Sequence, residues 1–129
     1  MSATEEEVES IARIAELHSQ RAPSDHPWAG HSLTDLLELT EYRRVRVDLT
    51  EAQLEQWLAA RPRAVERWLD WSEDKRTSGG CYVQRSPAGG WQIGSMSSDQ
   101  QTQYEAATTA VAAYILCELD YWVAPVENR

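Results

Sequence analysis

The sequence predicts an α+β fold in which four to five helices pack on one side of a small, three-stranded antiparallel sheet. Two stretches with apolar residues at helical spacing lie near the two ends of the chain. Between them lie a stretch of alternating residues and a glycine-rich connection that joins two short β-like segments. A length of 129 residues fits one domain that spans residues 1–129.

The first helix is predicted from about Glu5 to Gln20. Thr4 and Glu7 have the spacing of a capping box, in which each side chain bonds the other residue's backbone N–H. Three glutamates in the first turn suit the positive end of the helix dipole. One stripe at helical spacing is expected to be buried and comprises Val8, Ile11, Ala12 and Ala15.

A loop and a short helix are predicted next. Residues Ala22 to Gly30 include two prolines and a glycine, which is typical of a loop. Ser32 and Asp35 have the spacing of an N-cap for a short helix. The residues of this helix that are expected to face inward are Leu33, Leu36 and Leu37.

Residues Tyr42 to Leu49 are predicted to form a half-buried strand, because apolar and polar side chains alternate along them. The inward face comprises Val45, Val47 and Leu49. The solvent face comprises Tyr42, Arg44, Arg46 and Asp48.

Two helices are predicted after this strand. Thr50 and Gln53 cap the first, whose apolar residues are Leu54, Trp57 and Leu58. The second begins at Pro62, because proline is favoured at the first position of a helix. It runs to about Lys75 and is stopped by Gly79-Gly80. Its apolar face comprises Val65, Trp68 and Leu69.

A hairpin and a long helix complete the chain. Cys81 to Arg85 and Trp91 to Ser95 are predicted strands, because five residues rich in glycine connect them. Their inner face comprises Cys81, Val83, Trp91 and Ile93. The last helix is predicted from near Asp99 to just before Pro125. Its apolar stripe comprises Tyr104, Ala107, Val111, Tyr114, Ile115, Leu119 and Trp122.

Composition and charge exclude several classes of protein. The 12 Lys and Arg against 21 Asp and Glu give a net charge of −9, which disfavours phosphate backbones and favours basic partners. No apolar run reaches the roughly 18 residues of a membrane span. Met1 to Glu9 lacks the features of a signal peptide, so a cytoplasmic protein is expected. Cys81 and Cys117 are accordingly expected to be free thiols in apolar segments.

Glu118 is the most informative single position, because it falls between Tyr114 and Trp122 inside the apolar stripe of the last helix. A buried carboxylate must find hydrogen-bond donors or change its protonation state. One interpretation is a tuned acid or a ligand-facing group. The interpretation we favour is a salt bridge to an arginine such as Arg43, or partial exposure.

The sequence gives no positive indication of catalysis, a metal or a cofactor. His26 and His31 with Asp25 resemble metal ligands only weakly, and surface histidines are expected there and at His18. No Ser, Cys or Thr stands in a nucleophile context, and the glycine pairs lack the lysine of a phosphate loop. We therefore expect no catalytic residue, no metal and no cofactor.

The basic run Arg43, Arg44 and Arg46 admits a nucleic-acid hypothesis. In a strand, two of these arginines would share a solvent face with Tyr42, and Tyr82 and Gln84 would continue it. Some RNA-binding sheets stack bases on such a surface. The net charge of the chain opposes this function, so we expect a solvated face and no nucleic-acid partner.

An acidic ridge is the best candidate for a binding surface. Glu66, Asp70, Glu73 and Asp74 follow one side of a helix, with Trp71 at the edge of its apolar arc. Carboxylates beside a half-exposed Trp resemble a hot spot for a basic protein partner. The alternative is a solvated face partly neutralised by Arg63 and Arg67. The expected partner-binding residues are Asp70, Trp71, Glu73, Asp74 and Tyr82.

Residues 79–122 resemble a hairpin-then-helix pattern of small bacterial immunity proteins, which neutralise toxins and tend to be short, acidic and rich in Trp. The matching strings are Gly80-Cys81-Tyr82-Val83, Gly89-Gly90-Trp91-Gln92-Ile93-Gly94, Tyr104-Glu105-Ala106-Ala107 and Tyr114-Ile115-Leu116-Cys117-Glu118-Leu119-Asp120. The resemblance implies an inhibitor that binds a cognate toxin, and it carries over no functional residue.

Three function classes follow from these observations. The leading hypothesis is a non-enzymatic inhibitor that binds a basic toxin. The first alternative is a small-molecule-binding or hydrolytic domain with an aromatic pocket near Glu118. The second is a structural or assembly subunit. The oligomeric state stays open, and neither a membrane nor a nucleic acid is expected as a partner.

Overall fold

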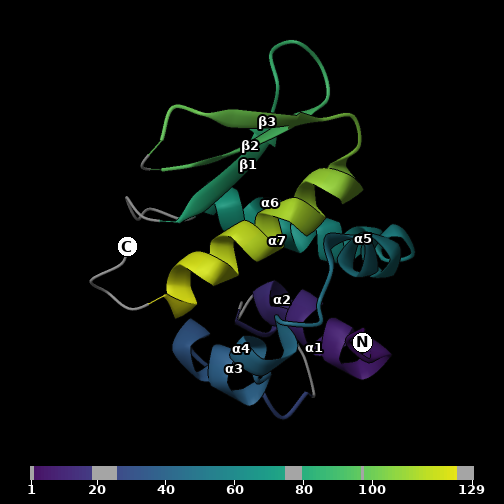
Figure 1. Cartoon of the computed structure of the whole chain (residues 1–129), viewed down its shortest axis with the longest axis vertical. Helices are drawn as coiled ribbons and strands as arrows, with labels where there is room; N and C mark the ends of the chain where they lie inside the picture. The colour runs from purple at the N-terminus through teal and green to yellow at the C-terminus, as the bar shows by residue number, and fades with distance from the viewer. Residues whose placement is uncertain (1, 19–25, 75–79, 97, 125–129) are drawn as a thin grey trace.

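The computed structural model describes residues 2–18, 26–74, 80–96 and 98–124, and within them it confirms the predicted α+β class. The helices are α1 (Glu5–Ala12), α2 (Ile14–His18), α3 (Leu33–Leu39), α4 (Tyr42–Val45), α5 (Glu51–Ala59), α6 (Pro62–Asp74) and α7 (Ala107–Val123). The strands are β1 (Cys81–Arg85), β2 (Trp91–Ser95) and β3 (Gln101–Tyr104). Helices lie on one side of the sheet (Figure 1).

The sheet is antiparallel with the order β1-β2-β3, and its first hairpin has the predicted bounds. Val83 pairs with Ile93, and Arg85 pairs with Trp91 beside the connection. Gly89 and Gly90 in that connection have φ angles of 98° and 74°, a region that glycine enters without steric cost. The buried inner face includes Cys81, Val83 and Ile93, as expected, while Trp91 is half-buried.

The third strand corrects the predicted start of the last helix near Asp99. Residues Gln101–Tyr104 pair with β2 from Gly94 to Trp91, and α7 begins only at Ala107. The polar side chains of β3 are exposed, while Tyr104 is half-buried and packs against the core from a strand instead of the predicted helical stripe. Backbone pairing with a strand that is already in place outweighs the weak periodicity of these residues.

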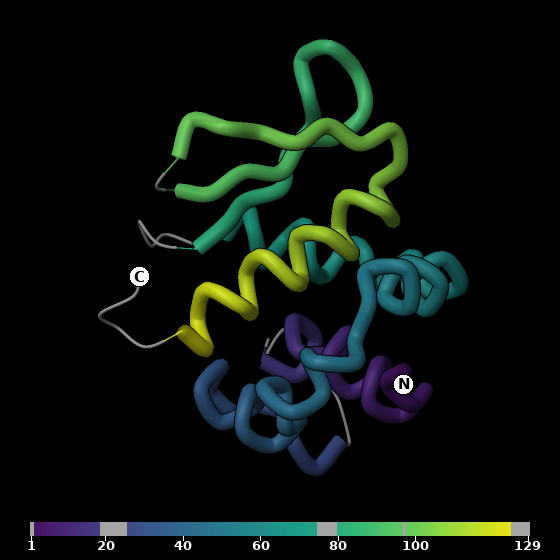
Figure 2. Tube along the Cα trace, in the orientation of Figure 1, coloured from purple at the N-terminus to yellow at the C-terminus, as the bar shows by residue number. Residues whose placement is uncertain are grey.

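Helix α7 lies at the centre of the fold. It contacts the sheet as well as α3, α5 and α6, and in the tube view it runs between the sheet and the N-terminal helices (Figure 2). Its residues Ala110 to Leu116 are all buried. Trp68 of α6 is also fully buried and donates from Nε1 to the Ala12 carbonyl oxygen at 2.7 Å. The core therefore joins both halves of the chain.

The predicted strand Tyr42–Leu49 is wrong, because these residues form α4 and a following turn. Tyr42, placed on the solvent face by the alternation, is fully buried, and Val47, placed inward, is 85 % exposed. The buried residues are Tyr42, Val45 and Leu49, which have helical spacing. The Tyr42 hydroxyl donates to Asp120 Oδ1 of α7 at 2.7 Å.

The surroundings of the Tyr42 hydroxyl also favour its protonated form. Burial, followed by the neighbouring Asp120 carboxylate, raises the pKa of the Tyr42 hydroxyl well above its ordinary value. Arg46 Nε donates to the same carboxylate at 3.0 Å. Because Asp120 accepts from two residues at α4, this pair of contacts holds the α4 segment against α7.

The predicted first helix is interrupted at Arg13, which caps α1 and separates it from α2. Residues 19–25, which include the end of that prediction and most of the expected loop, lie outside the described residues. The Thr4 and Thr50 capping boxes and the Ser32 N-cap are confirmed. The predicted stripe is buried at Val8, Ile11, Ala12 and Ala15.

The helix predicted from Pro62 is confirmed as α6, and Val65 and Trp68 are buried on its inner face. Leu36 of α3 is fully buried, while Leu33 and Leu37 pack partly against the core. The predicted helix end at Lys75 and the first residue of the Gly79-Gly80 stop lie outside the described residues.

Candidate protein-binding interface

A groove with a volume of about 670 Å³ runs between α6 and the first two strands. We call it the α6–sheet groove. Leu69 and Glu73 line it from α6, Tyr82 from β1, and Trp91 from β2. Met96, which directly follows β2, also lines it and is 38 % exposed. The groove therefore combines apolar and aromatic surface with the Glu73 carboxylate and the Arg85 guanidinium.

The structure brings two of the five expected partner-binding residues together in this groove, Glu73 and Tyr82. Asp70 and Asp74 are exposed on the same helix α6. We call the exposed carboxylates Asp70, Glu73 and Asp74 of α6 the acidic rim, of which Glu73 lines the groove. Trp71 is half-buried and has a different position, described below.

Tyr82 is held in one orientation by all three strands. Its hydroxyl accepts a hydrogen bond from Gln101 Nε2 of β3 at 2.8 Å. Its ring covers Gly94 of β2 so closely that a Cβ atom there would lie 2.5 Å from the hydroxyl oxygen. A fixed aromatic side chain loses little conformational entropy on binding, which suits a contact residue.

Trp91 packs partly against the core, as predicted for the inner face of the hairpin, and also lines the groove. It is half-buried and lines the groove, and the Arg85 guanidinium carbon lies 4.9 Å from the centroid of its ring. Its position at the first residue of β2, beside the glycine connection, is the sequence signal that could have indicated partial exposure.

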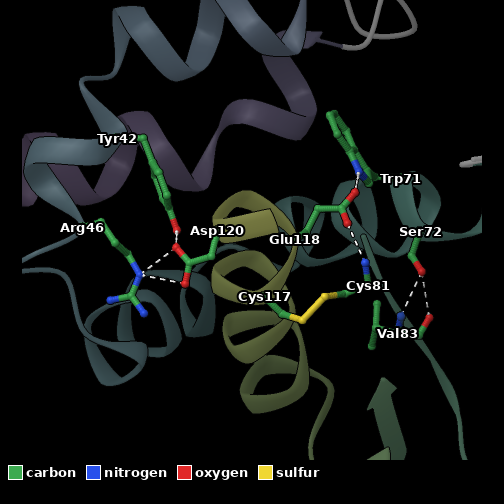
Figure 3. The surroundings of a disulfide bond; sticks show 9 residues. All are labelled: Tyr42, Arg46, Trp71, Ser72, Cys81, Val83, Cys117, Glu118 and Asp120. Atoms are coloured by element: carbon green, nitrogen blue, oxygen red, sulfur yellow. Dashed lines mark hydrogen bonds and ion pairs between the residues drawn. A yellow bond between two sulfur atoms is a disulfide. The ribbon is translucent and has the colours of Figure 1, made fainter. Parts of the chain in front are cut away.

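Trp71 packs against the core and does not line the groove. Its Nε1 donates to Glu118 Oε2 at 3.0 Å (Figure 3), and its ring centroid lies 5.5 Å from that of Trp68 and 5.0 Å from that of His18. The indole therefore packs against the core and uses its polar atom inside the protein. It fixes the orientation of α6, whose outer side carries the acidic rim.

Glu118 of α7 is fully buried, and its carboxylate accepts hydrogen bonds from residues of both β1 and α6. Its second oxygen, Oε1, accepts from the Cys81 backbone N–H of β1 at 2.9 Å, while Oε2 holds Trp71 of α6 (Figure 3). Burial, followed by the charge of Glu118, raises the pKa of the nearby Tyr114 hydroxyl. With no exposed surface, the Glu118 carboxylate presents no oxygen to a ligand.

The expected salt bridge between Glu118 and Arg43 is wrong. Arg43 is exposed and donates from its guanidinium to the Val123 carbonyl oxygen near the end of α7. Two of the donors to the Glu118 carboxylate are an indole and a backbone N–H, which carry no formal charge. The helical pattern located Glu118 correctly but could not identify donors 47 and 37 residues away.

The expectation of free thiols is also wrong, because Cys81 and Cys117 form a disulfide that joins β1 to α7 (Figure 3). Their Cα atoms are 6.1 Å apart, within the usual range for a disulfide. Packing of β1 against α7 places the two apolar-patterned segments side by side. Together with Glu118, the disulfide anchors the N-terminal end of β1 twice.

Ser72 joins α6 to the middle of β1. Its hydroxyl accepts from the Val83 backbone N–H at 2.9 Å and donates to the Val83 carbonyl oxygen at 3.2 Å (Figure 3). Ser72 and Val83 are both buried. This pair of bonds fixes the spacing between the two walls of the α6–sheet groove.

We expect Ser72→Ala to lower the free energy of unfolding by about 2 kcal/mol, because two buried backbone groups of Val83 lose their partner. Urea unfolding followed by far-ultraviolet circular dichroism measures the change. The control is Ser10→Ala in α1, whose hydroxyl bonds a carbonyl of its own helix. Equal stabilities for the two variants would contradict the role given to Ser72.

The other expected functional clusters are dispersed. Arg44 bonds Glu7 and Glu41, and Arg46 bonds Asp120, so these arginines do not form a basic strand face.

The metal hypothesis is not supported by the part of the chain that is described. His31 Nδ1 lies 3.4 Å from Asp35, and His26 accepts from the Trp28 backbone. Asp25 lies outside the described residues. In the described ranges, no group of three or more His, Cys, Asp or Glu side chains is placed to hold a metal ion.

Two general findings complete the description. Of the helices described, none has the length and apolar character needed to cross a membrane. A scan against protein-family models and searches of curated proteins and of solved structures found no match to this chain.

Proposed function

We propose that this protein is a non-enzymatic binding module that holds a basic segment of a partner protein in the α6–sheet groove. The observation that carries this proposal is a groove lined by Tyr82, Trp91 and Glu73, with Asp70 and Asp74 exposed on the same helix as Glu73. An apolar, aromatic centre with a charged margin is the usual anatomy of a protein interface.

Charge supports a basic partner. Asp70 and Glu73 are exposed, and neither forms an ion pair among the described residues. The chain as a whole carries a net charge of −9. Such a field raises the association rate with a cationic surface and depends on ionic strength. A cationic active site, such as that of a toxin that cleaves nucleic acid, has this complementary charge.

The biological role that fits best is an immunity-type inhibitor of a cognate bacterial toxin, which would occlude the active site of the toxin. The resemblance of residues 79–122 to small immunity proteins supports this role. The groove adds a surface where the partner would bind.

A cytoplasmic location is part of this proposal, and the disulfide makes it testable. Disulfides persist mainly in oxidising compartments, while the structure joins Cys81 to Cys117. Alkylation of thiols in intact cells of the source organism distinguishes the locations: reduced cysteines support the cytoplasm, and an intact disulfide contradicts it.

The test uses charge reversal on the rim. We expect Asp70→Lys/Glu73→Lys to slow association with the partner about tenfold at low salt and to weaken its salt dependence, since the steering charge is reversed. The partner is isolated with the wild-type chain as bait, and surface plasmon resonance measures both rate constants.

The control is Glu38→Lys/Glu105→Lys, which changes the net charge equally at exposed positions of α3 and before α7. Its association rate should fall much less. If both double variants associate equally fast, the acidic rim is not the binding surface. Recovery of only further copies of this chain would favour the assembly-subunit alternative instead.

A further inference from the structure

A second groove concentrates arginines in this acidic protein. It has a volume of about 540 Å³ and lies between α1–α2 and α5–α6. Its lining includes four arginines and two glutamates: Arg13, Arg61, Arg63, Arg67, Glu9 and Glu16. We call it the arginine groove. Its charged lining sums to +2, whereas the whole chain carries −9.

Two of these arginines are free to bind a ligand. Arg63 and Arg67 stand one helical turn apart on α6, and neither forms an ion pair or a side-chain hydrogen bond among the described residues. Their guanidinium groups therefore make no contact ion pair with the acidic ridge of α6 among the described residues. Arg13, in contrast, bonds Glu16 at 2.8 Å.

Arg61 is held in place at the groove wall. Its guanidinium carbon lies 4.2 Å from the centroid of the Trp57 ring, and its Nη1 donates to the Trp57 carbonyl oxygen at 2.9 Å. Stacking on the indole leaves the remaining N–H groups of Arg61 in a fixed plane. A guanidinium fixed in this way suits recognition of a planar or tetrahedral oxyanion.

The buried indole nitrogen of Trp57 is another feature of the arginine groove. Its side chain lines the arginine groove and is only 7 % exposed, yet its Nε1 donor has no acceptor among the described residues. Buried donors without a partner are rare in folded proteins. Because the indole lies at the groove wall under Arg61, a phosphate bound to the neighbouring arginines would change the surroundings of this N–H.

The backbone adds to the positive potential. Helix α6 has 13 residues and begins at Pro62, next to Arg61 and Arg63 of the groove. The N-terminal end of a helix carries a partial positive charge, which favours anions. Pro62 has no N–H, and Ala64 and Val65 donate theirs to the Arg61 carbonyl oxygen, so the backbone contributes this charge more than free donors.

We propose that the arginine groove binds the phosphate group of a small phosphorylated molecule. A phosphate monoester carries a charge of about −1.5 to −2 at neutral pH, which balances the +2 of the lining, whereas a single carboxylate balances half of it. Arginine forms bidentate hydrogen bonds with phosphate oxygens. This site is separate from the α6–sheet groove, because the two grooves share no lining residue.

Titration of the full chain with inorganic phosphate, pyrophosphate and adenosine monophosphate tests the proposal. Isothermal calorimetry at constant ionic strength gives the dissociation constants, and the indole N–H signals in the NMR spectrum report on Trp57. We expect Arg63→Gln/Arg67→Gln to raise the dissociation constant for pyrophosphate at least about tenfold, since each lost charged hydrogen bond has that effect. The Trp57 indole signal should shift on binding, whereas that of Trp71, bonded to Glu118, should not.

Arg43→Gln/Arg85→Gln is the matched control, because it removes two exposed arginines outside the arginine groove. It should leave the dissociation constants unchanged. Equal weakening by both double variants, or an unshifted Trp57 signal, would overturn the proposal. The proposal would also be overturned if a single-stranded oligonucleotide bound the chain and pyrophosphate did not compete with it. Partner association by the Arg63→Gln/Arg67→Gln variant separately tests the proposed function, which does not depend on this groove.

Discussion

Replacing Cys81 and Cys117 with alanine is expected to lower the free energy of unfolding by about 4 kcal/mol. The disulfide closes a chain segment with a sequence separation of 36 residues, and the loss of loop-closure entropy in the unfolded state gives this magnitude. The urea midpoint should fall accordingly. Reduction of the wild-type protein with dithiothreitol should produce a similar shift.

The double alanine variant supplies the control for reduction, because dithiothreitol should leave its midpoint unchanged. Thiol titration of the unfolded, unreduced chain gives an independent measurement. Two reactive thiols per chain would show that the cysteines are unpaired and would contradict the link between β1 and α7.

Glu118→Ala is expected to cost about 4 kcal/mol of stability. The substitution leaves two donors, the part-buried Trp71 indole N–H and the buried Cys81 backbone N–H, without their acceptor. Each unsatisfied buried donor costs about 1–3 kcal/mol. Glu118→Gln should cost less, because the amide oxygen keeps one of the two bonds while its NH₂ group faces the other donor.

Equilibrium urea unfolding measures both Glu118 variants, with Glu105→Ala as a control at an exposed position before α7. The control should change stability by no more than about 0.5 kcal/mol. An unchanged unfolding free energy in Glu118→Ala, together with loss of partner or ligand binding, would instead make this residue part of a binding site.

The hairpin could be predicted from sequence because its information is local. Gly89 and Gly90 occupy backbone conformations that other residues avoid, so the connection is visible in the sequence itself. The strands Cys81–Arg85 and Trp91–Ser95 then follow from residues adjacent to that turn. The capping boxes at Thr4 and Thr50 are equally local and were equally accessible.

The α4 segment could not be predicted because two periodicities fit it. Val45, Val47 and Leu49 alternate as in a strand, while Tyr42, Val45 and Leu49 have helical spacing. The hydrogen bond from Tyr42 to Asp120, 78 residues later, accompanies the helical solution. Strand β3 was missed for a similar reason, because its pairing with β2 stabilises a polar segment that has little apolar alternation of its own.

The candidate interface was partly visible in the sequence. Helical spacing indicated the acidic ridge, including Glu73, and strand alternation placed Tyr82 on the outer side of β1. That Glu73 and Tyr82 line one groove depends on how α6 packs along β1. The bonds that fix this packing come from Ser72 and Glu118, whose partners are distant in the sequence.

Ser72 has a consequence for self-association. A strand at the edge of a sheet exposes unpaired backbone groups on which another chain can add a strand. At β1 three of these groups are occupied: Ser72 bonds both the N–H and the carbonyl of Val83, and Glu118 bonds the N–H of Cys81. The Ser72 hydroxyl and the Glu118 carboxylate thus oppose strand addition along the first half of the β1 edge, which makes β3 the more open side of this sheet.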